Sequence, residues 1–448
     1  MPFLLPGYGV DPDTWGVAYN ARRISQTHIY SVSRFPGYPL QELTYALIWR
    51  GGPLLQNGLT ALQSGIAAVF LALSAKKLGY QAPIIGALIF AFTPVIYINS
   101  VNSLDYLWAI SFILGSLYFA ISEKTNLAGL FLGLAIGTRI TSVIMLLPLA
   151  LVLIHRGAVR KEVIRFALIS TAVGGLFYIP ALFVYGTKFL THHTGAPLPL
   201  YRILFNATIG VWGWVGFVVL IAMILLLLLR PMHSKVGING SQKPTYWKIW
   251  LISIVFYILL YLYLPHEPGY LIPLVPFTIL FFQEFFNRKI LLLLGSAVIC
   301  SSLLIGFYSN DQVHSPGFNQ QFRDFSTRVR GSNLDFFVVP LYGSVLYDHS
   351  SRADEFDRIG KIIANGNQLD HKSVIIVGWN LSKFAILGLY INKHPKNIIY
   401  TDFMDLDSLI YYQNNDYDIY FLPEMLPVNR ELFNIDLTEF GGKAIVTD

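Results

Sequence analysis

The sequence contains few charged residues and a single cysteine. Charged side chains make up 13% of its 448 residues, whereas a soluble domain carries about 25%. The lone Cys300 excludes an intrachain disulfide and so gives no clue to redox compartment. Internal repeats and low-complexity tracts are absent, and residues 1–6 are too short for the apolar part of a cleavable signal peptide. Apolar residues dominate instead, at 54% of the total, which indicates a polytopic membrane protein with a soluble part.

Basic and acidic residues are divided unevenly along the chain. Residues 1–308 hold 20 Lys and Arg against 8 Asp and Glu, whereas residues 309–448 hold 12 against 18. The net charge of +6 therefore conceals a basic apolar part and an acidic C-terminal part. We interpret the basic excess as a signal of membrane topology and not as a nucleic-acid-binding patch, so no nucleic-acid partner is expected.

Ten apolar segments are candidate transmembrane helices, because a helix needs roughly 20 apolar residues to cross the hydrocarbon layer. They cover 57–75, 82–98, 104–121, 127–138, 141–154, 163–185, 207–229, 249–264, 270–286 and 290–308. The two short segments beside Arg139 also fit one kinked helix, but that interpretation separates the basic loop at Arg156 from the other basic loops. Ten crossings place 12 basic residues in cytoplasmic loops and only Arg139, Lys188 and Arg202 in short outer loops, a positive-inside bias.

Ten crossings also place residues 1–56 and 309–448 outside the cytoplasm. Because residues 1–56 must then cross the membrane with no hydrophobic helix before them, we expect a further transmembrane helix upstream. Within this first outer loop, Asp13 is expected to cap an amphipathic helix. Residues 40–49 are expected to lie in the membrane interface, with Trp49 at headgroup level.

Residues 309–448 have the pattern of a small α/β domain. Strands are predicted at 373–379, 397–401, 417–423 and 444–447, and helices at 381–391 and 404–413. This alternation predicts three layers with a partly parallel sheet. Val377-Gly378-Trp379 lacks the further glycines of a dinucleotide fingerprint, so no nucleotide site is predicted. The predicted fold is a polytopic α-helical membrane protein, with its membrane domain at 57–308, followed by a small extracytoplasmic α/β domain.

Polar residues near the apolar segments gather on the predicted outer side. They are Asp11, Asp13, Arg22, Arg34, Asp105, Arg139, His192, His266 and Glu267. Such convergence at one face is typical of an active site. Asp11 and Asp13 suit a general base or a metal site, and alternatively a helix cap with a solvated carboxylate beside it.

The other members of this group also have two interpretations each. Asp105 is either a functional carboxylate or a helix cap in water. Arg139 either pairs with Asp105 or binds a substrate phosphate through its planar guanidinium. The loop at His266 and Glu267, with two prolines and a glycine, either faces the site or is structural. His192 and His193 are adjacent and point in different directions, which argues against a metal site there.

Several short motifs follow one another on the outer side. They are Asp13 with Ala21-Arg22, Arg34-Phe35-Pro36-Gly37-Tyr38-Pro39, Asn57–Leu62, Asn102–Tyr106, Gly133–Arg139 and His266–Pro273. In this order they resemble motifs of the GT-C superfamily of membrane glycosyltransferases, especially protein O-mannosyltransferases and lipid A aminoarabinose transferases. The resemblance covers roughly residues 1–280. The chain departs from the family in its missing first helix and in Gly269, where an arginine usually precedes Tyr270.

The resemblance implies transfer of a sugar, with inversion, from a polyprenyl-phosphate-linked donor to a hydroxyl of a lipid, glycan or protein acceptor. It implies Asp13, with Asp11, as the catalytic base and Asp105 as an orienting residue. The substrate-binding residues that it implies are Arg34, Arg139, Arg22, His266, Glu267 and Tyr270. Relatives with a single-sugar lipid donor generally need no metal, so no cofactor is expected, with a divalent cation left as the alternative. The expected location is the cytoplasmic membrane of a prokaryote, with the site on the outer face.

Two other classes of protein compete with this interpretation. A transporter or flippase for lipid-linked sugars predicts inverted repeats and charged or broken helices near the bilayer midplane, and the sequence shows neither. A non-catalytic membrane assembly protein predicts that the outer carboxylates are replaceable without loss.

Overall fold

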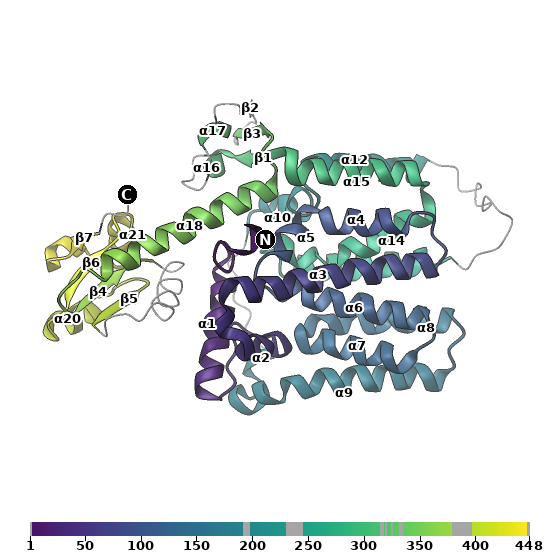
Figure 1. Ribbon diagram of the computed structural model, residues 1–448, viewed down its shortest axis with the longest axis horizontal. Helices are drawn as coiled ribbons and strands as arrows, with labels where there is room; N and C mark the ends of the chain where they lie inside the picture. The colour runs from purple at the N-terminus through teal and green to yellow at the C-terminus, as the bar shows by residue number, and fades with distance from the viewer. Residues whose placement is uncertain are drawn as a thin grey trace.

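The computed structural model describes residues 2–190, 198–229, 245–313, 318, 320–323, 326–330, 335–378 and 397–445. Its larger part is a bundle of apolar helices lying side by side, with an α/β domain beyond one end (Figure 1). The bundle helices are α3 (Gly52–Lys77), α4 (Pro83–Phe92), α5 (Pro94–Ser100), α6 (Tyr106–Ile121), α7 (Thr125–Thr138), α8 (Leu146–His155), α9 (Arg160–Tyr185), α10 (Leu200–Ala207), α11 (Ile209–Trp212), α12 (Trp214–Leu229), α13 (Trp247–Tyr263), α14 (Leu274–Phe285) and α15 (Arg288–Ile299).

Each of the ten predicted apolar segments forms one helix or a short series of helices in this bundle. The prediction was wrong at the end of the last segment. A π-helical turn at Cys300–Leu304 ends the helix there, and Ile305–Ser309 continues as strand β1. The reason is tertiary, because β1 pairs with strand β3, which lies about thirty residues further along the chain.

Three helical stretches among the described residues are long and apolar enough to cross a membrane: Pro39–Lys77, Arg160–Tyr185 and Pro268–Phe285. The number rises to five if each of two bent helix pairs is one span. Four further apolar helices are shorter, between 10 and 17 residues. The structure thus shows a helical, apolar bundle, while ten crossings remain a prediction.

The two bent pairs are broken helices that the sequence analysis did not expect. α4 and α5 meet at 68° and the α10–α11 stretch meets α12 at 94°. Pro94 begins α5 after Thr93 has ended α4, and Gly213, at φ +68°, separates α11 from α12. Arg202 is the one charged residue in these helices. The bent pairs match the broken helices that a transporter predicts. They do not match its expectation of charged residues within those helices, because they contain only Arg202.

The first segment of the chain folds into two helices across one end of the bundle (Figure 1), α1 (Pro12–Thr27) and α2 (Pro39–Ile48). The helix begins two residues earlier than predicted: Asp11, not Asp13, is the cap, and its carboxylate accepts the Asp13 N–H at 2.8 Å. Pro12 explains the shift, because its fixed φ suits the first helical position and its missing N–H is not needed there.

The C-terminal part contains two sheets. Strands β1 (Ile305–Ser309), β3 (Asp335–Pro340) and β2 (Thr327–Arg330) form an antiparallel sheet in the order β1-β3-β2. The second sheet is parallel, in the order β5-β4-β6-β7. Its strands are β4 (Ser373–Ile376), β5 (Ile398–Thr401), β6 (Asp418–Phe421) and β7 (Lys443–Ala444), and its neighbouring helices are α20 (Leu406–Asn414) and α21 (Met425–Phe433).

The parallel sheet lies where the sequence predicts strands, and β4 at its centre is fully buried. Val374 of β4 faces Ile399 on one side and Ile419 on the other. The predicted helix at 381–391 lies outside the described residues. The first sheet and the long helix α18 (Ser344–Gly366), which connects the bundle to the parallel sheet, were not predicted (Figure 1).

The core of the α/β domain continues into the first segment of the chain. Tyr8, Trp15 and Ala18 belong to the same buried cluster as the central strands of the parallel sheet. Trp15 also lies beside Phe356 of α18, with ring centroids 6.3 Å apart. Arg352 of α18, 2% exposed, donates a hydrogen bond to the Phe3 carbonyl at 3.1 Å. The domain therefore supports the backbone that leads to Asp11.

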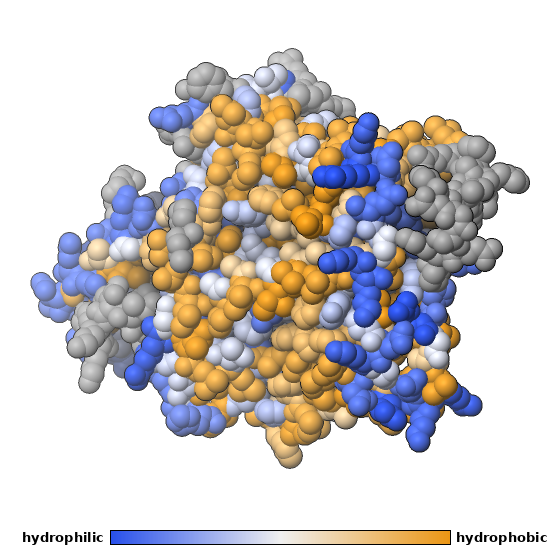
Figure 2. Space-filling model, turned by 45° about the vertical axis from the view of Figure 1, so that its right-hand side comes forward, coloured by the Kyte–Doolittle hydropathy of each residue, from blue (hydrophilic) through white to orange (hydrophobic). Residues whose placement is uncertain are grey.

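The outside of the bundle is apolar between two hydrophilic ends (Figure 2). Leu168, Leu176 and Phe183 of α9 are exposed along this surface. At the end away from the α/β domain, Arg156 after α8 pairs with Glu123 before α7 at 3.0 Å. Loops that carry the predicted cytoplasmic basic residues thus meet at one end.

Candidate active site

Asp105 is the centre of the polar group at the other end of the bundle. It directly precedes α6 and is completely buried, and its side chain makes no helix-capping hydrogen bond. Instead one carboxylate oxygen accepts from Arg139 at 2.5 Å and the other from Arg34 at 3.0 Å. Asp105 thus occupies the N-cap position of α6, as one alternative expected, but its side chain neither caps the helix nor contacts water. Its two charged partners offset the cost of burying the carboxylate.

Arg34 connects Asp105 to the first helix. Its guanidinium also forms an ion pair with Asp13, and its Nε donates to the Tyr38 hydroxyl at 2.7 Å. Arg34 is 17% exposed and Asp13 33% exposed, so the pair opens toward solvent on the Asp13 side. Asp13, Arg34 and Asp105, which are distant in sequence, thus form one continuous series of ion pairs.

A buried carboxylate holds the loop that carries Arg34. Glu42 of α2 is fully buried. It accepts from the Tyr30 hydroxyl and the Ser33 N–H, both at 2.6 Å, and from the Tyr38 N–H at 3.1 Å. These donors come from both ends of the Arg34 loop. The sequence analysis did not identify Glu42, although an acidic residue in an apolar amphipathic helix indicates a paired or functional group.

Arg139 is enclosed by aromatic rings. Its guanidinium carbon lies 4.3 Å from the centroid of Tyr106, 5.1 Å from that of Tyr270 and 5.6 Å from that of Tyr38. Ring faces attract a cation, so the rings fix the plane of the guanidinium. Its ion pair with Asp105 uses one of five N–H donors, and 11% of the side chain remains exposed. Of these rings, only Tyr270 was predicted as a site residue.

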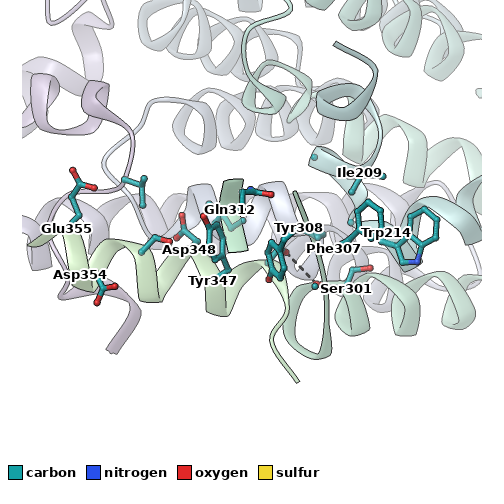
Figure 3. A pocket seen from close by; sticks show the side chains of 18 of the residues that line it. Ile209, Trp214, Ser301, Phe307, Tyr308, Gln312, Tyr347, Asp348, Asp354 and Glu355 are labelled. Atoms are coloured by element: carbon teal, nitrogen blue, oxygen red, sulfur yellow. Dashed lines mark hydrogen bonds between the residues drawn. The ribbon is translucent and has the colours of Figure 1, made fainter. Parts of the chain in front are cut away.

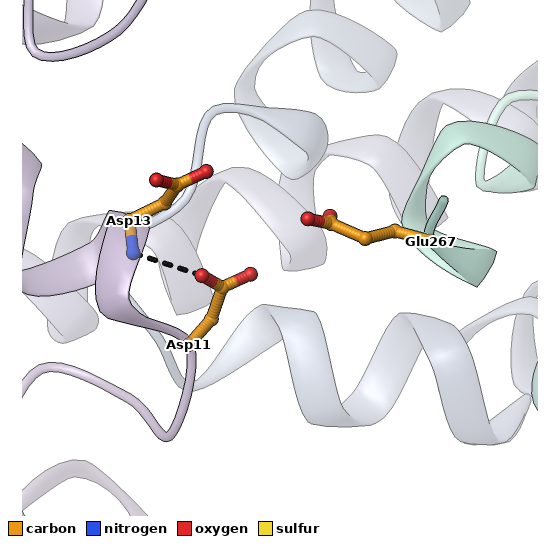
Figure 4. Close-up of side chains that lie close together, drawn as sticks. All are labelled: Asp11, Asp13 and Glu267. Carbon is orange, nitrogen blue, oxygen red and sulfur yellow. Dashed lines mark hydrogen bonds between the residues drawn. The ribbon is translucent and has the colours of Figure 1, made fainter. Parts of the chain in front are cut away.

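A second group of carboxylates lies beside this ion-pair chain. Asp11, Asp13 and Glu267 point toward a common space (Figure 4), and one oxygen of each lies within 4.8 Å of the others. Glu267 comes from the loop between α13 and α14, and it accepts from the Tyr106 hydroxyl at 2.9 Å. Tyr106 therefore contacts both groups, because its ring faces Arg139.

The surroundings of Asp11 change its acidity. Burial raises its pKa, and the nearby carboxylates of Glu267 and Asp13 raise it further, against the lowering effects of Arg34 and of the Asp13 N–H. The resulting pKa is about 7, compared with 3.8 for a free side chain. A carboxylate with a pKa near neutrality is suited to accept a proton from a substrate hydroxyl.

The three carboxylates also have the composition of a site for a hard divalent cation, which prefers oxygen ligands. A cation there would be held by Asp11, Asp13 and Glu267. It would act by polarising a bound oxygen atom. The expectation that no metal is required stays a prediction.

The structure gives a reason for the glycine at position 269. A Cβ at this position would lie 2.9 Å and 3.0 Å from ring atoms of Tyr106. Tyr106 occupies the space that a side chain would need, and it contacts both Glu267 and Arg139. A phosphate contact by Arg34 or Arg139 remains a prediction.

We expect Gly269→Ala to impair the site by displacing the Tyr106 ring. Overpacking of this kind costs about 1–3 kcal/mol, and the shift should lengthen the Tyr106–Glu267 hydrogen bond. Thermal unfolding of the variant measures the first effect and a crystal or cryo-EM structure the second. Gly58→Ala is the matched control, because a Cβ there meets nothing within 4 Å. Equal unfolding temperatures for the two variants would contradict this account of Gly269.

The remaining predicted residues make other contacts or lie outside the described residues. Arg22 lies nine residues after Asp13 on α1, about 13 Å along the helix axis, and its guanidinium packs over the Trp49 ring at 5.4 Å. His266 contributes its carbonyl, which accepts from Asn206 at 3.1 Å. His192 and His193 lie outside the described residues. Substrate contacts by Arg22 and His266 remain predictions.

No protein-family model matches this chain, and no curated protein matches it either.

Proposed function

We propose that this chain is a membrane glycosyltransferase of the GT-C type that uses a polyprenyl-phosphate-linked sugar. One observation carries the proposal: two arginines and four carboxylates converge at one end of an apolar helical bundle. In the proposed topology all ten apolar segments cross the membrane. The ends of α3 and α8 and the starts of α7 and α15 then bring the basic loops to the cytoplasmic side. The charged groups and the α/β domain lie on the outer side.

The reaction we propose is a single displacement with inversion. A carboxylate accepts the proton of the acceptor hydroxyl, and that oxygen forms a bond to the anomeric carbon. The bond from this carbon to the lipid phosphate breaks, and the polyprenyl phosphate leaves. Arg139 and Arg34 stabilise the charge that develops on the departing phosphate, and Asp105 holds both guanidinium groups in place.

The contacts favour Asp11 over Asp13 for the role of base. The sequence analysis names Asp13 first, with Asp11 beside it. Asp13, however, is paired with the Arg34 cation. Asp11 faces carboxylates and has a pKa of about 7. We therefore assign proton transfer to Asp11 and the positioning of Arg34 to Asp13.

Native mass spectrometry of the protein purified gently from its own membranes tests this proposal. The wild type is compared with Asp11→Asn, which lacks the proposed base. We expect a bound species with the mass of a polyprenyl phosphate or its glycosylated form, enriched in the variant because turnover stalls. Bulk phospholipid alone in both samples would contradict the donor assignment. It would favour the transporter, whose broken helices the structure contains, or the assembly protein.

A further inference from the structure

A cavity of about 1010 Å³ lies between the bundle and α18, apart from the two charged groups described above (Figure 3). Ligand pockets typically enclose about 300–1,000 Å³, so this cavity is large enough for a substrate. Val10, next to Asp11, lines it. Gly210 lines it too, and a Cβ there would lie 3.2 Å from Pro268, the neighbour of Glu267. The cavity is therefore lined by the residue before Asp11 and by a residue that lies against the neighbour of Glu267.

The two ends of the cavity differ in chemistry. The end formed by the bundle and β1 is apolar and aromatic, with Ile98, Ile209 and Trp214 in its wall. Trp214 stacks on Phe307 with centroids 4.9 Å apart and an angle of 11° between the rings. Figure 3 shows Ile209 and Trp214 at one end of the view and Asp354 and Glu355 at the other.

The other end, along α18, is acidic. Five carboxylates line the cavity against two basic side chains: Asp348, Asp354, Glu355, Asp357 and Glu424 against Arg358 and Lys361. Arg358 is already paired with Glu424. Ser351 Oγ is buried in the same wall and has no hydrogen-bond partner among the described residues. Buried hydroxyls normally have a partner, and a bound ligand would supply one.

We propose that this cavity binds the acceptor, and that the acceptor is an amphiphile with an apolar chain and an uncharged, hydroxyl-bearing head. This proposal rests on the proposed function. The chain lies against Ile98, Ile209 and Trp214, and the head donates hydrogen bonds to the carboxylates of α18. An anionic head such as a phosphate is repelled by the excess of carboxylates. One hydroxyl of the head reaches Asp11 past Val10. Its proton goes to the Asp11 carboxylate, and its oxygen forms the new bond to the anomeric carbon.

Binding of simple amphiphiles tests this proposal without turnover. The full chain is placed in phosphatidylcholine nanodiscs, and binding of labelled decyl glucoside and decyl phosphate is measured with empty nanodiscs subtracted. We expect one saturable site for decyl glucoside and at least tenfold weaker binding of decyl phosphate. Ile209→Trp, which fills the apolar end, should weaken decyl glucoside binding at least tenfold. Leu176→Trp on the exposed surface of α9 is the matched control and should bind like the wild type.

A second variant covers the case in which Ile209→Trp fails to fold. Ser344→Cys, made in a Cys300→Ser background, is labelled after purification with a bulky maleimide, and the label should block the site. Equal binding of the two probes, or unchanged binding after both modifications, would overturn the proposal. Failure of the proposed function is distinguishable, because the assay contains no donor. If Asp11→Asn kept its transferase activity while decyl glucoside still bound in the cavity, the assignment of the base would fall and the binding site would stand.

Discussion

Replacement of Asp11 by asparagine should reduce sugar transfer by roughly 10²–10⁴-fold, the usual contribution of a general base. Asparagine retains an oxygen that accepts the Asp13 N–H, so the cap of α1 and the fold should survive. What it loses is the ability to take a proton at pH 7. The measurement is transfer from a polyprenyl-phosphate sugar in nanodiscs, with the unfolding temperature recorded for each variant. Asp407→Asn, an exposed carboxylate on α20, is the control and should keep full activity.

The pH dependence of the wild type gives an independent test of the same role. A base acts only when ionised, and the pKa of Asp11 is raised to about 7. The rate should therefore be highest above pH 7 and fall as the pH drops through that value. The residual rate of Asp11→Asn should not show this step. A wild-type rate that stays level between pH 5 and pH 8 would remove Asp11 from the proton transfer.

Replacement of Asp105 by asparagine should destabilise the protein by about 3–5 kcal/mol, the cost of removing one partner of a buried ion pair. Asp105 is fully buried and forms an ion pair with both Arg34 and Arg139. Without it, two cations remain close together in a low-dielectric environment. The measurement is equilibrium unfolding in detergent, together with transfer activity, which should fall because both guanidinium groups lose their fixed positions.

A double variant separates charge from packing at this position. Asp105→Asn combined with Arg139→Gln leaves one cation, Arg34, which keeps its contact with Asp13. The double variant should unfold at a higher denaturant concentration than Asp105→Asn alone. Comparison of the double variant with both single variants, Asp105→Asn and Arg139→Gln, gives the coupling. If instead the two single effects simply add, the pair contributes no electrostatic coupling and Asp105 stabilises the fold by packing.

Much of the helical architecture was predictable because it follows from local hydropathy. The backbone N–H and C=O groups of an apolar run in a membrane must form hydrogen bonds with one another, and a helix allows this within the segment. A proline and a glycine in the sequence mark the breaks at Thr93–Pro94 and at Gly213. The bend angles of 68° and 94° depend on how the helices pack. Strand β1 was missed because its pairing partner, β3, lies far along the chain.

The candidate site was predictable in its members and not in its contacts. The sequence identified Asp105 and Arg139 because charges are costly beside apolar segments. It named Asp105 as one of two partners for Arg139, and the structure shows this pair. It did not show that Arg34 completes the chain to Asp13, or that Glu267 joins Asp11. Each of these contacts joins loops that are separated by whole helices.

The sequence by itself determined an apolar helical bundle, an acidic α/β domain and a set of charged residues placed between apolar segments. Hydropathy, charge counts and strand alternation are local properties, so one chain is enough to read them. Only the tertiary structure decided that Asp11 has neighbours which raise its pKa, that Tyr106 excludes a side chain at residue 269, and that α18 closes a cavity beside Val10. These features arise from the distances between side chains of different helices, and such distances are set by how the helices pack.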